Sequence, residues 1–494
     1  MGILDKWKDE IDAQPTPFWL DWIAKKFDRN VYEKQKEKQT LKAISGIYGN
    51  AHWAFPREVQ AMGLFSPDGI PLGLYRANNH PLHYVGEQHL ITISPNRTGK
   101  GTTAIIPALL EHTASCIVVD PKGQDAAITA RRRRELGQEV FFLNPFPDDM
   151  PEAFRLPCHG FNPLAKLDPK SPRFVANVAA LGEALVLDDG GQRYFTDSAR
   201  DLVEALIMWV CLDDKEDASL PTVRRALGLS DEKLKELAEE LAKHQFRPIA
   251  NKMSRFTDPQ RDALAVLNTA RTETKLLDDP AIDAVLSSNS FDWADLKRKP
   301  MTVYLILPSD LLESHARWLR LMLSSALSAL QSTEKSKKPV LFILDEFAQL
   351  GHLSAIENAM GLAAGYGVQL WPILQDLGQL QSVYKQRWES FLANAGITQV
   401  LRANDEVTKD YFIKKAGTYT GYASTESSGK GGGGTSVSRA AVNLLQSQEI
   451  TGAANDLGFL FVNGSAAPVL QTRIPYFAPN SRYQSMYDPD PYHQ

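Results

Sequence analysis

Residues 89–103 read HLITISPNRTGKGTT, and an apolar run at residues 104–110 follows them. The apolar residues before the loop are typical of a buried strand, and the run after it is typical of a helix. A strand, a Gly-Lys loop and a helix in this order form the setting of a P-loop, in which backbone N–H groups bind phosphate and a lysine neutralises its charge. This stretch predicts an α/β nucleotide-binding domain with Lys100 at its centre.

The loop departs from the pattern G-x-x-x-x-G-K-[ST] at two positions. Ser94 stands where the first glycine is expected, and Gly101 stands where a magnesium-binding hydroxyl is expected. Thr102 is our candidate for that hydroxyl, with Thr103 as the alternative. On the motif alone, an ordinary turn between a strand and a helix is the competing interpretation. The residues expected to line the nucleotide are Asn96, Arg97, Thr98, Gly99, Lys100, Gly101, Thr102 and Thr103.

A second apolar stretch ends in two acids, because residues 339–347 read PVLFILDEF. A buried parallel strand would bring these acids to the carboxyl edge of the sheet, where P-loop enzymes hold magnesium and activate water. We predict that Asp345 ligates Mg²⁺ and that Glu346 polarises the attacking water. A strand that ends in a solvated Asp-Glu turn is the alternative.

A third predicted strand, at residues 368–374, is followed by Gln375. An amide at this position would align water beside the γ-phosphate or report its hydrolysis, and a strand-capping glutamine is the alternative. Pro372 lies inside this strand. Since proline cannot donate a hydrogen bond to a central ladder, we expect a bulge or a local break there.

Several ring-forming NTPases use an arginine from one subunit to stabilise the transition state in its neighbour. Arg402 is the favoured candidate because it follows a predicted strand at residues 397–401, and Arg317 and Arg320 are the alternatives. A basic run at residues 131–134 is interpreted as a solvated helix face, with contact to a nucleic-acid backbone as the other possibility.

The chain has 494 residues, with 54 Lys and Arg against 59 Asp and Glu, giving a formal charge of −5. This length predicts several domains, and the charge means that any nucleic acid would meet a local patch or pore. Three scattered cysteines match neither a disulfide framework nor a zinc site and favour a reducing compartment. The longest apolar run, residues 205–212, is shorter than the roughly 20 residues of a spanning helix.

Strand-like runs alternate with helical stretches up to residue 164 and again from residue 301. Between residues 165 and 300, apolar residues recur only at helical spacing. We therefore expect an α/β domain that is split by an all-α domain. A Gly/Ser-rich segment at residues 424–438 is expected to be a loop. The predicted parts are a helical arm at 1–50, the nucleotide-binding domain at 51–164 and 301–478, the all-α domain at 165–300 and a tail at 479–494.

Six short motifs follow one another along the chain: GNAHWA at 49–54, PNRTGKG at 95–101, VDPKG at 119–123, FNPL at 161–164, LDEFAQLG at 344–351 and QDLGQL at 375–380. Together they resemble the type IV coupling proteins, the ATPases that deliver DNA or protein substrates to type IV secretion and conjugation machines. The resemblance implies a RecA-like P-loop domain with an inserted all-α domain, ATP and Mg²⁺ as cofactors, and a homo-hexameric ring with ATP between its subunits.

The resemblance also implies partners and a location. The expected partners are the secretion-channel components and their ATPases, adaptor proteins, a relaxase–DNA complex or effector proteins, and DNA itself. Members of this family usually carry an N-terminal transmembrane hairpin, which the given sequence does not show. The expected location is the cytoplasmic face of the bacterial inner membrane.

Two other functions are compatible with the same nucleotide-binding core. One is a ring-shaped DNA translocase for segregation or packaging, which double-stranded DNA would stimulate. The other is a docking receptor that binds nucleotide through its altered P-loop without hydrolysing it.

Overall fold

The computed structural model of the chain describes residues 48–187, 193–213, 217–257, 261–427, 434–452, 456–479 and 481–492. The predicted arm, except for its last three residues, lies outside the described residues, as does the centre of the Gly/Ser-rich segment. Within the described ranges, no helix is both long enough and apolar enough to cross a membrane.

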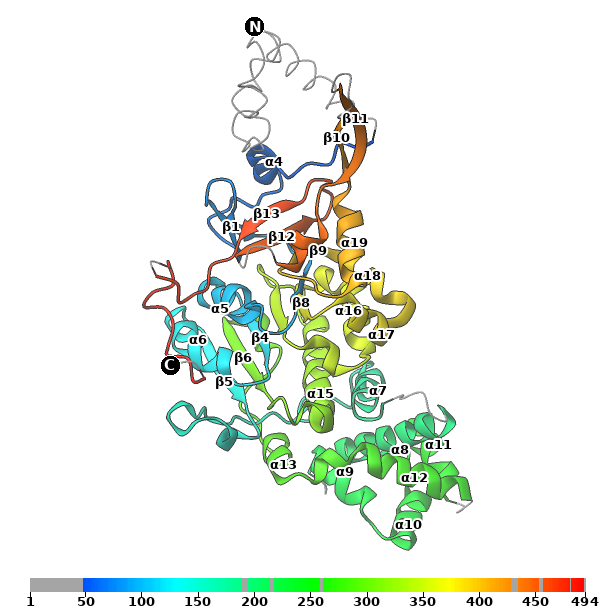
Figure 1. The fold of residues 1–494 in the computed structure, drawn as a ribbon. Coiled ribbons are helices and arrows are strands. Elements are labelled where there is room, and N and C mark those ends of the chain that lie inside the picture. The colour runs from blue at the N-terminus through cyan, green and yellow to red at the C-terminus, as the bar shows by residue number, and fades with distance from the viewer. Residues whose placement is uncertain are drawn as a thin grey trace.

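One sheet of eleven strands forms the body of the molecule, and strands from both halves of the chain build it (Figure 1). In chain order its strands are β1 (Ile70–Tyr75), β2 (Pro81–Tyr84), β3 (His89–Ile93), β4 (Cys116–Asp120), β5 (Glu139–Leu143), β6 (Met301–Ile306), β7 (Val340–Leu344), β8 (Val368–Leu374), β9 (Ala395–Val400), β12 (Leu457–Val462) and β13 (Val469–Thr472). Across the sheet they follow the order β2-β1-β13-β12-β9-β3-β8-β7-β4-β6-β5.

The strands from β9 to β5 in this order all run parallel, whereas β12, β13, β1 and β2 join through antiparallel pairs. Every residue of β3, β4, β7 and β8 is buried. Burial on both faces explains why these strands are continuous apolar runs rather than alternating ones. The predicted α/β class is confirmed.

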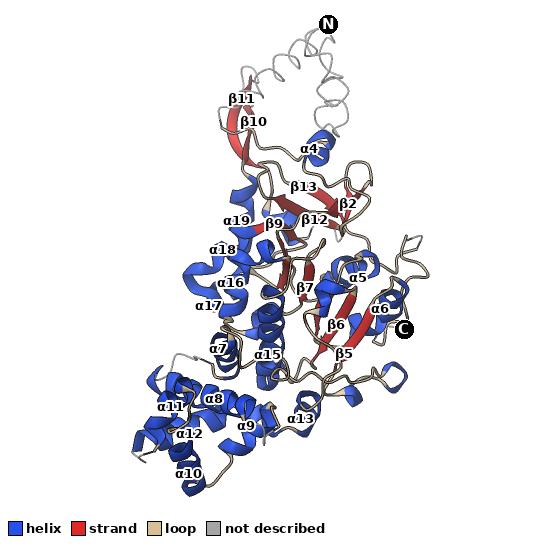
Figure 2. Ribbon diagram, turned by 180° about the vertical axis from the view of Figure 1, so that it is seen from behind, coloured by secondary structure: helices blue, strands red, loops and turns tan. Residues whose placement is uncertain are grey.

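Helices cover both faces of the parallel strands (Figures 1 and 2). On one face, α5 (Ile106–Glu111) and α6 (Gln124–Glu135) bury small and branched side chains against β4 and β7. On the other face lie α15 (Leu312–Gln331), α16 (Ser354–Leu362), α17 (Leu377–Tyr384), α18 (Trp388–Asn394) and α19 (Glu406–Ala416). Two short helices, α4 (Pro56–Ala61) and α20 (Ser447–Thr451), complete this part of the chain.

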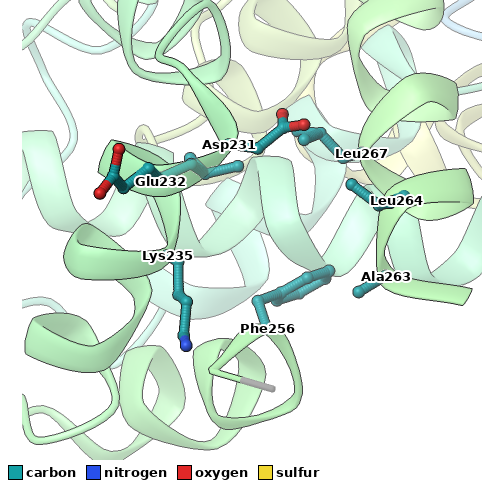
Figure 3. Close-up of a pocket in the computed structure, with 8 residues that line it drawn as sticks. Asp231, Glu232, Lys235, Phe256, Ala263, Leu264 and Leu267 are labelled. Carbon is teal, nitrogen blue, oxygen red and sulfur yellow. The ribbon is translucent and has the colours of Figure 1, made fainter. Parts of the chain in front are cut away.

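Between β5 and β6 the described chain contains helices and no strand. Helices α8 to α12 gather at one end of the molecule, away from the sheet (Figure 1), and a shallow pocket between α10 and α12 contains the apolar Phe256 and Leu267 (Figure 3). The helices are α7 (Phe174–Leu185), α8 (Arg193–Leu212), α9 (Leu220–Leu227), α10 (Asp231–Leu241), α11 (Arg247–Met253), α12 (Arg261–Glu273), α13 (Pro280–Leu286) and α14 (Asp295–Arg298).

The prediction of a loop at residues 424–438 is wrong at both ends of that segment. There β10 (Thr418–Ser427) and β11 (Gly434–Asn443) form an antiparallel hairpin that is continuous from the pair Thr418–Asn443 to the pair Ser427–Gly434. A two-stranded ribbon is held by main-chain hydrogen bonds, so it does not require the apolar pattern by which strands are recognised.

Pro372 distorts its strand less than expected. The pairing of β8 with β7 continues through it, with Pro372 opposite Leu344. The pairing with β3 covers only Ile373 and Leu374. Before Ile373 a side-chain hydrogen bond connects β8 to β3, since the Trp371 indole donates to Thr92 Oγ1 at 2.8 Å. The missing N–H of Pro372 therefore interrupts the pairing of β8 with β3 and leaves the pairing with β7 intact.

The basic run on α6 is not a uniformly solvated face. Arg133 is fully buried and donates to the Leu109 carbonyl at 3.1 Å, to the Ala114 carbonyl at 2.9 Å and to Gln138 Oε1 at 2.7 Å. Its neighbour Arg131 is only half-buried and pairs with Glu135 and Asp488. Arg133 therefore ties α6 to the chain between α5 and β4.

We expect Arg133→Leu to lower the free energy of unfolding by about 3 kcal/mol, because it leaves buried carbonyl groups without a donor. Arg131→Leu, from the same helix, is the matched control and should cost less than about 1 kcal/mol. Urea denaturation followed by circular dichroism measures both. Equal losses in the two variants would contradict the structural role of Arg133.

Candidate functional site

The predicted phosphate loop connects β3 to a π-helical turn at Gly101–Ile105 that leads into α5. Ser94 is buried, and its hydroxyl contacts the hydroxyl of Thr98, which also donates to the Pro95 carbonyl at 2.6 Å. Ser94 thus closes the loop through its side chain where the usual pattern has glycine. Arg97 and Gly99 adopt left-handed backbone conformations, with φ of 60° and 89°, which turn the chain tightly before Lys100.

The start of the helix presents two hydroxyl groups to the loop. Thr102 Oγ1 and Thr103 Oγ1 donate to the Gly99 carbonyl at 3.2 and 2.8 Å, which leaves the lone pairs of both oxygens available to a cation. A Cβ added to Gly101 would meet no atom within 4 Å. Lack of space for a side chain therefore does not explain why position 101 holds glycine rather than serine or threonine.

Lys100 lies between the two acids that follow β7. Its Nζ is 2.8 Å from Asp345 Oδ1 and hydrogen-bonds to Glu346 Oε1. These side chains are 14 to 16% exposed, so the contact is largely shielded from solvent. Glu346 has φ of 52°, a left-handed conformation that is unfavourable for a residue with a Cβ. The carboxylate is thus turned toward Lys100 at a cost in backbone energy.

The ionisation of the two acids is driven in opposite directions. Burial favours the neutral form of Glu346, but the Lys100 charge and the hydrogen bonds that Glu346 accepts outweigh it and lower its pKa. For Asp345 burial prevails and the pKa is raised. Burial disfavours the charge on Lys100, yet the two carboxylates together raise its pKa. Glu346 is therefore the more strongly ionised acid of the pair.

Gln375 joins the cluster from the end of β8. Its Nε2 donates to Glu346 Oε2 at 3.0 Å, and Gln349 donates to the same oxygen at 3.4 Å. Each oxygen of the Glu346 carboxylate therefore has a donor. The carboxyl ends of β3, β7 and β8 thus bring together Lys100, Asp345, Glu346 and Gln375.

The sequence analysis gave no role to Asp120, which ends β4 beside β7. Asp120 is buried and accepts the backbone N–H groups of Ala126 at 2.8 Å and Lys122 at 3.3 Å. Burial raises its pKa to about 6, and burial together with the charges of Asp120 and Asp345 raises the pKa of Asp125 well above its usual range. An acid directly after an apolar strand was the signal used for Asp345, and it would also have found Asp120.

The candidate arginines lie apart from this cluster. Arg402 follows β9, on the side of β3 that is opposite to β7 and β8. Burial, together with the charge of Arg402, lowers the pKa of the neighbouring Arg473. Arg317 pairs with Glu273 at 2.8 Å. Arg320 is buried and donates to the Leu350 carbonyl at 2.9 Å. Arg317 and Arg320 are therefore engaged within their own subunit.

The site fits magnesium bound together with phosphate. Nowhere in the described part of the chain do three His, Cys, Asp or Glu residues converge to hold a metal by themselves. Mg²⁺ prefers oxygen ligands and commonly takes one or two carboxylates plus substrate phosphates. A buried carboxylate at Asp345 and the hydroxyls at Thr102 and Thr103, on either side of Lys100, supply oxygen donors of that kind.

The sequence matches the family described as Type IV secretory system Conjugative DNA transfer over residues 36–490. Protein VirD4 of Rhizobium radiobacter is 32% identical over 397 residues, which cover 76% of this chain and 55% of VirD4. Conjugal transfer protein TraG of Escherichia coli is 25% identical over 426 residues, which cover 77% of this chain and 66% of TraG. The chain thus spans about half the length of the VirD4 relatives.

Two solved structures share the fold. The unbound conjugative coupling protein TrwBdeltaN70 has a TM-score of 0.64 at 15% identity, over 87% of this chain and 94% of TrwB. TrwB in complex with ADP and Mg²⁺ also has a TM-score of 0.64, at 14% identity, over 87% of this chain and 96% of that one. This likeness confirms the predicted RecA-like P-loop fold.

A double-mutant cycle tests the contact between Lys100 and Glu346. Without nucleotide, Lys100→Met and Glu346→Gln should show a coupling of about 1 to 3 kcal/mol in the free energy of unfolding, because each leaves the other charge poorly compensated. The exposed pair Lys335 and Glu87, at 2.7 Å, is the control, with an expected coupling below about 1 kcal/mol. Additivity at the first pair would contradict the geometry described above.

Proposed function

This chain belongs to the type IV secretory system conjugative DNA transfer family, and from that membership we propose that it is a coupling protein: an ATPase that delivers DNA-protein or protein substrates to a secretion channel. The observation that carries the proposal is the cluster of Lys100, Asp345, Glu346 and Gln375 at the carboxyl edge of a P-loop sheet. Family membership supports conjugative transfer, and the cluster supports hydrolysis of ATP.

In the proposed mechanism, the loop at residues 96–103 binds the phosphates through its backbone N–H groups, and Lys100 turns from Glu346 to the β- and γ-phosphates. Asp345 and Thr102 would hold Mg²⁺, which supplies neutralisation of the phosphate charge when it is bound. Release from Lys100 frees one oxygen of Glu346 to accept a proton from the attacking water. Gln375, which already bonds the other oxygen, keeps the carboxylate oriented.

The exchange of partners at Lys100 has a physical advantage. While Glu346 is paired with Lys100, its oxygen is unavailable to water, so the carboxylate cannot act as the base. Triphosphate carries more negative charge than one carboxylate and competes for the ammonium group. Binding of the substrate would therefore also activate the base.

The wider setting is part of the same proposal. We assign residues 51–164 and 301–478 to the nucleotide-binding domain and 165–300 to the all-α domain, which is supported by one sheet that contains strands from both sides of the helical segment. As a coupling protein the chain would form a hexamer at the cytoplasmic face of the inner membrane. Its partners would be channel components and their ATPases, adaptor proteins, and relaxase–DNA or effector substrates.

We expect magnesium-dependent ATP hydrolysis that falls about 100-fold or more in Lys100→Ala and in Glu346→Gln, because one loses phosphate neutralisation and the other loses the base. Glu346→Gln should still bind ATP. Phosphate release measured on the purified chain checks both variants.

The matched controls are Lys335→Ala and Glu139→Gln, which alter exposed residues at the amino ends of β7 and β5, the opposite edge of the sheet from the site, and should keep wild-type turnover. Wild-type turnover in both site variants would contradict the assignment. Binding of ATP by the wild-type chain with no phosphate release would instead favour the docking receptor.

We propose Arg402 as the catalytic arginine. Arg402 follows β9, on the side of β3 away from Asp345, Glu346 and Gln375 of its own subunit, and this position favours action on the site of a neighbouring subunit. Mixing Lys100→Ala with Arg402→Ala subunits should therefore restore part of the ATP turnover, because composite sites would then contain both side chains. Turnover that stays at the level of the separate variants would contradict action between subunits.

A further inference from the structure

The strand order divides the surroundings of the phosphate loop into two sides. Asp345, Glu346 and Gln375 follow β7 and β8, on one side of β3, while β9, β12 and β13 lie on the other side. In a P-loop the lysine and the magnesium site mark the γ-phosphate end of the nucleotide, and the nucleoside extends away from them. The nucleoside end should therefore lie toward β9 and β13.

A short segment after β13, residues 473–477, starts on that side and reaches α5 and α6, and we call it the strap. Arg473 is buried, and its Nη1 donates to the Thr98 carbonyl of the phosphate loop at 2.7 Å. The backbone N–H of Tyr476 donates to the Thr102 carbonyl at 3.0 Å. The strap is thus fixed at two points to the loop and to the first turn of the helix that follows it.

The two aromatic side chains of the strap differ in their exposure to solvent. Tyr476 is buried in a cluster with Ile106 and Leu110 of α5 and Ile128 of α6. Phe477 is 54% exposed, and its ring meets that of Tyr476 edge-on, with centroids 5.2 Å apart at 88°. More than half of Phe477 therefore stays open to solvent beside this contact. Because burial of a phenylalanine side chain is favourable by roughly 2 kcal/mol, a ring held this way is suited to cover an apolar ligand surface.

The position of Phe477 suits a nucleobase. Its Cα lies within about 8 Å of the Thr102 carbonyl, since it follows directly on the residue that bonds that carbonyl. The backbone at Thr102 is where the phosphate nearest the nucleoside meets the start of the helix. A phosphate and a ribose together bridge a gap of this size.

The charges on this side favour an anion. Arg402 and Arg473 are close enough that burial and the charge of Arg402 lower the pKa of Arg473, with Asp456 opposing them. Asp456 also pairs with Arg76. Two neighbouring guanidinium groups beside a phosphate loop gain most from a polyanionic ligand.

We propose that the strap forms the nucleoside-binding part of the site, with Phe477 stacking on the base and Arg473 positioning the loop. This rests on the proposed function, since it places the remainder of the same nucleotide. Stacking uses the face of a base rather than its hydrogen-bonding edge, so the contact should accept adenine and guanine nucleotides alike.

The experiment compares two ligands, magnesium-ATP and inorganic triphosphate, which lacks the nucleoside. Phe477→Ala should bind ATP about tenfold more weakly and triphosphate as tightly as the wild-type chain, and Phe477→Trp should restore ATP binding. Tyr366→Ala, another exposed aromatic (48%) that lies before β8, at the opposite edge of the sheet, is the matched control and should change neither affinity. Titration calorimetry measures all of them.

Unchanged ATP affinity in Phe477→Ala, or equal losses for ATP and triphosphate, would overturn the assignment of the strap. Failure of the proposed function has different signatures: the wild-type chain would bind neither ligand, or it would bind ATP without releasing phosphate. Arg473→Lys adds a second readout: a partial loss that affects ATP and triphosphate equally is expected of a residue that positions the loop, whereas a loss for ATP alone would contradict that role.

Discussion

The ammonium group of Lys100, shielded from water between Asp345 and Glu346, is the interaction on which the site depends. A buried charge is tolerated only when it is compensated, and the compensating groups here come from a strand about 240 residues away in the sequence. Parallel packing makes this possible, because it brings the carboxyl ends of β3, β7 and β8 to one edge. The same constraint explains why β7 is apolar throughout and then abruptly acidic.

The geometry also restrains the Glu346 carboxylate. Glu346 is ionised and oriented, yet both of its oxygens are occupied by protein donors. Its strained backbone conformation is maintained by these contacts. In the proposed mechanism the phosphates would draw Lys100 out of this arrangement, which would link their binding to release of the Glu346 carboxylate. The strap bonds the loop at Thr98 and the start of the following helix at Thr102.

The strands and acids of the core could be predicted from the sequence because they obey local rules. β8 was predicted with its observed bounds, β7 lies within the apolar stretch that was predicted to end in two acids, and the four clustered residues follow from where parallel strands end. The strap could not be predicted, since its contact with Thr98 depends on β13 joining the sheet next to β12. β1 was missed because Pro71 and Gly73 weaken its strand pattern, and the hairpin of β10 and β11 because main-chain pairing leaves little trace in Ser- and Gly-rich sequence.

The most direct test of the central claim is a crystal structure of this chain with a non-hydrolysable ATP analogue and Mg²⁺. The account predicts that the triphosphate lies along residues 96–103, that Lys100 Nζ contacts the γ-phosphate, and that its hydrogen bond to Glu346 is broken while the bond from Gln375 to Glu346 persists. A bound analogue with the Lys100–Glu346 contact intact, or with its phosphates outside the loop, would contradict the account.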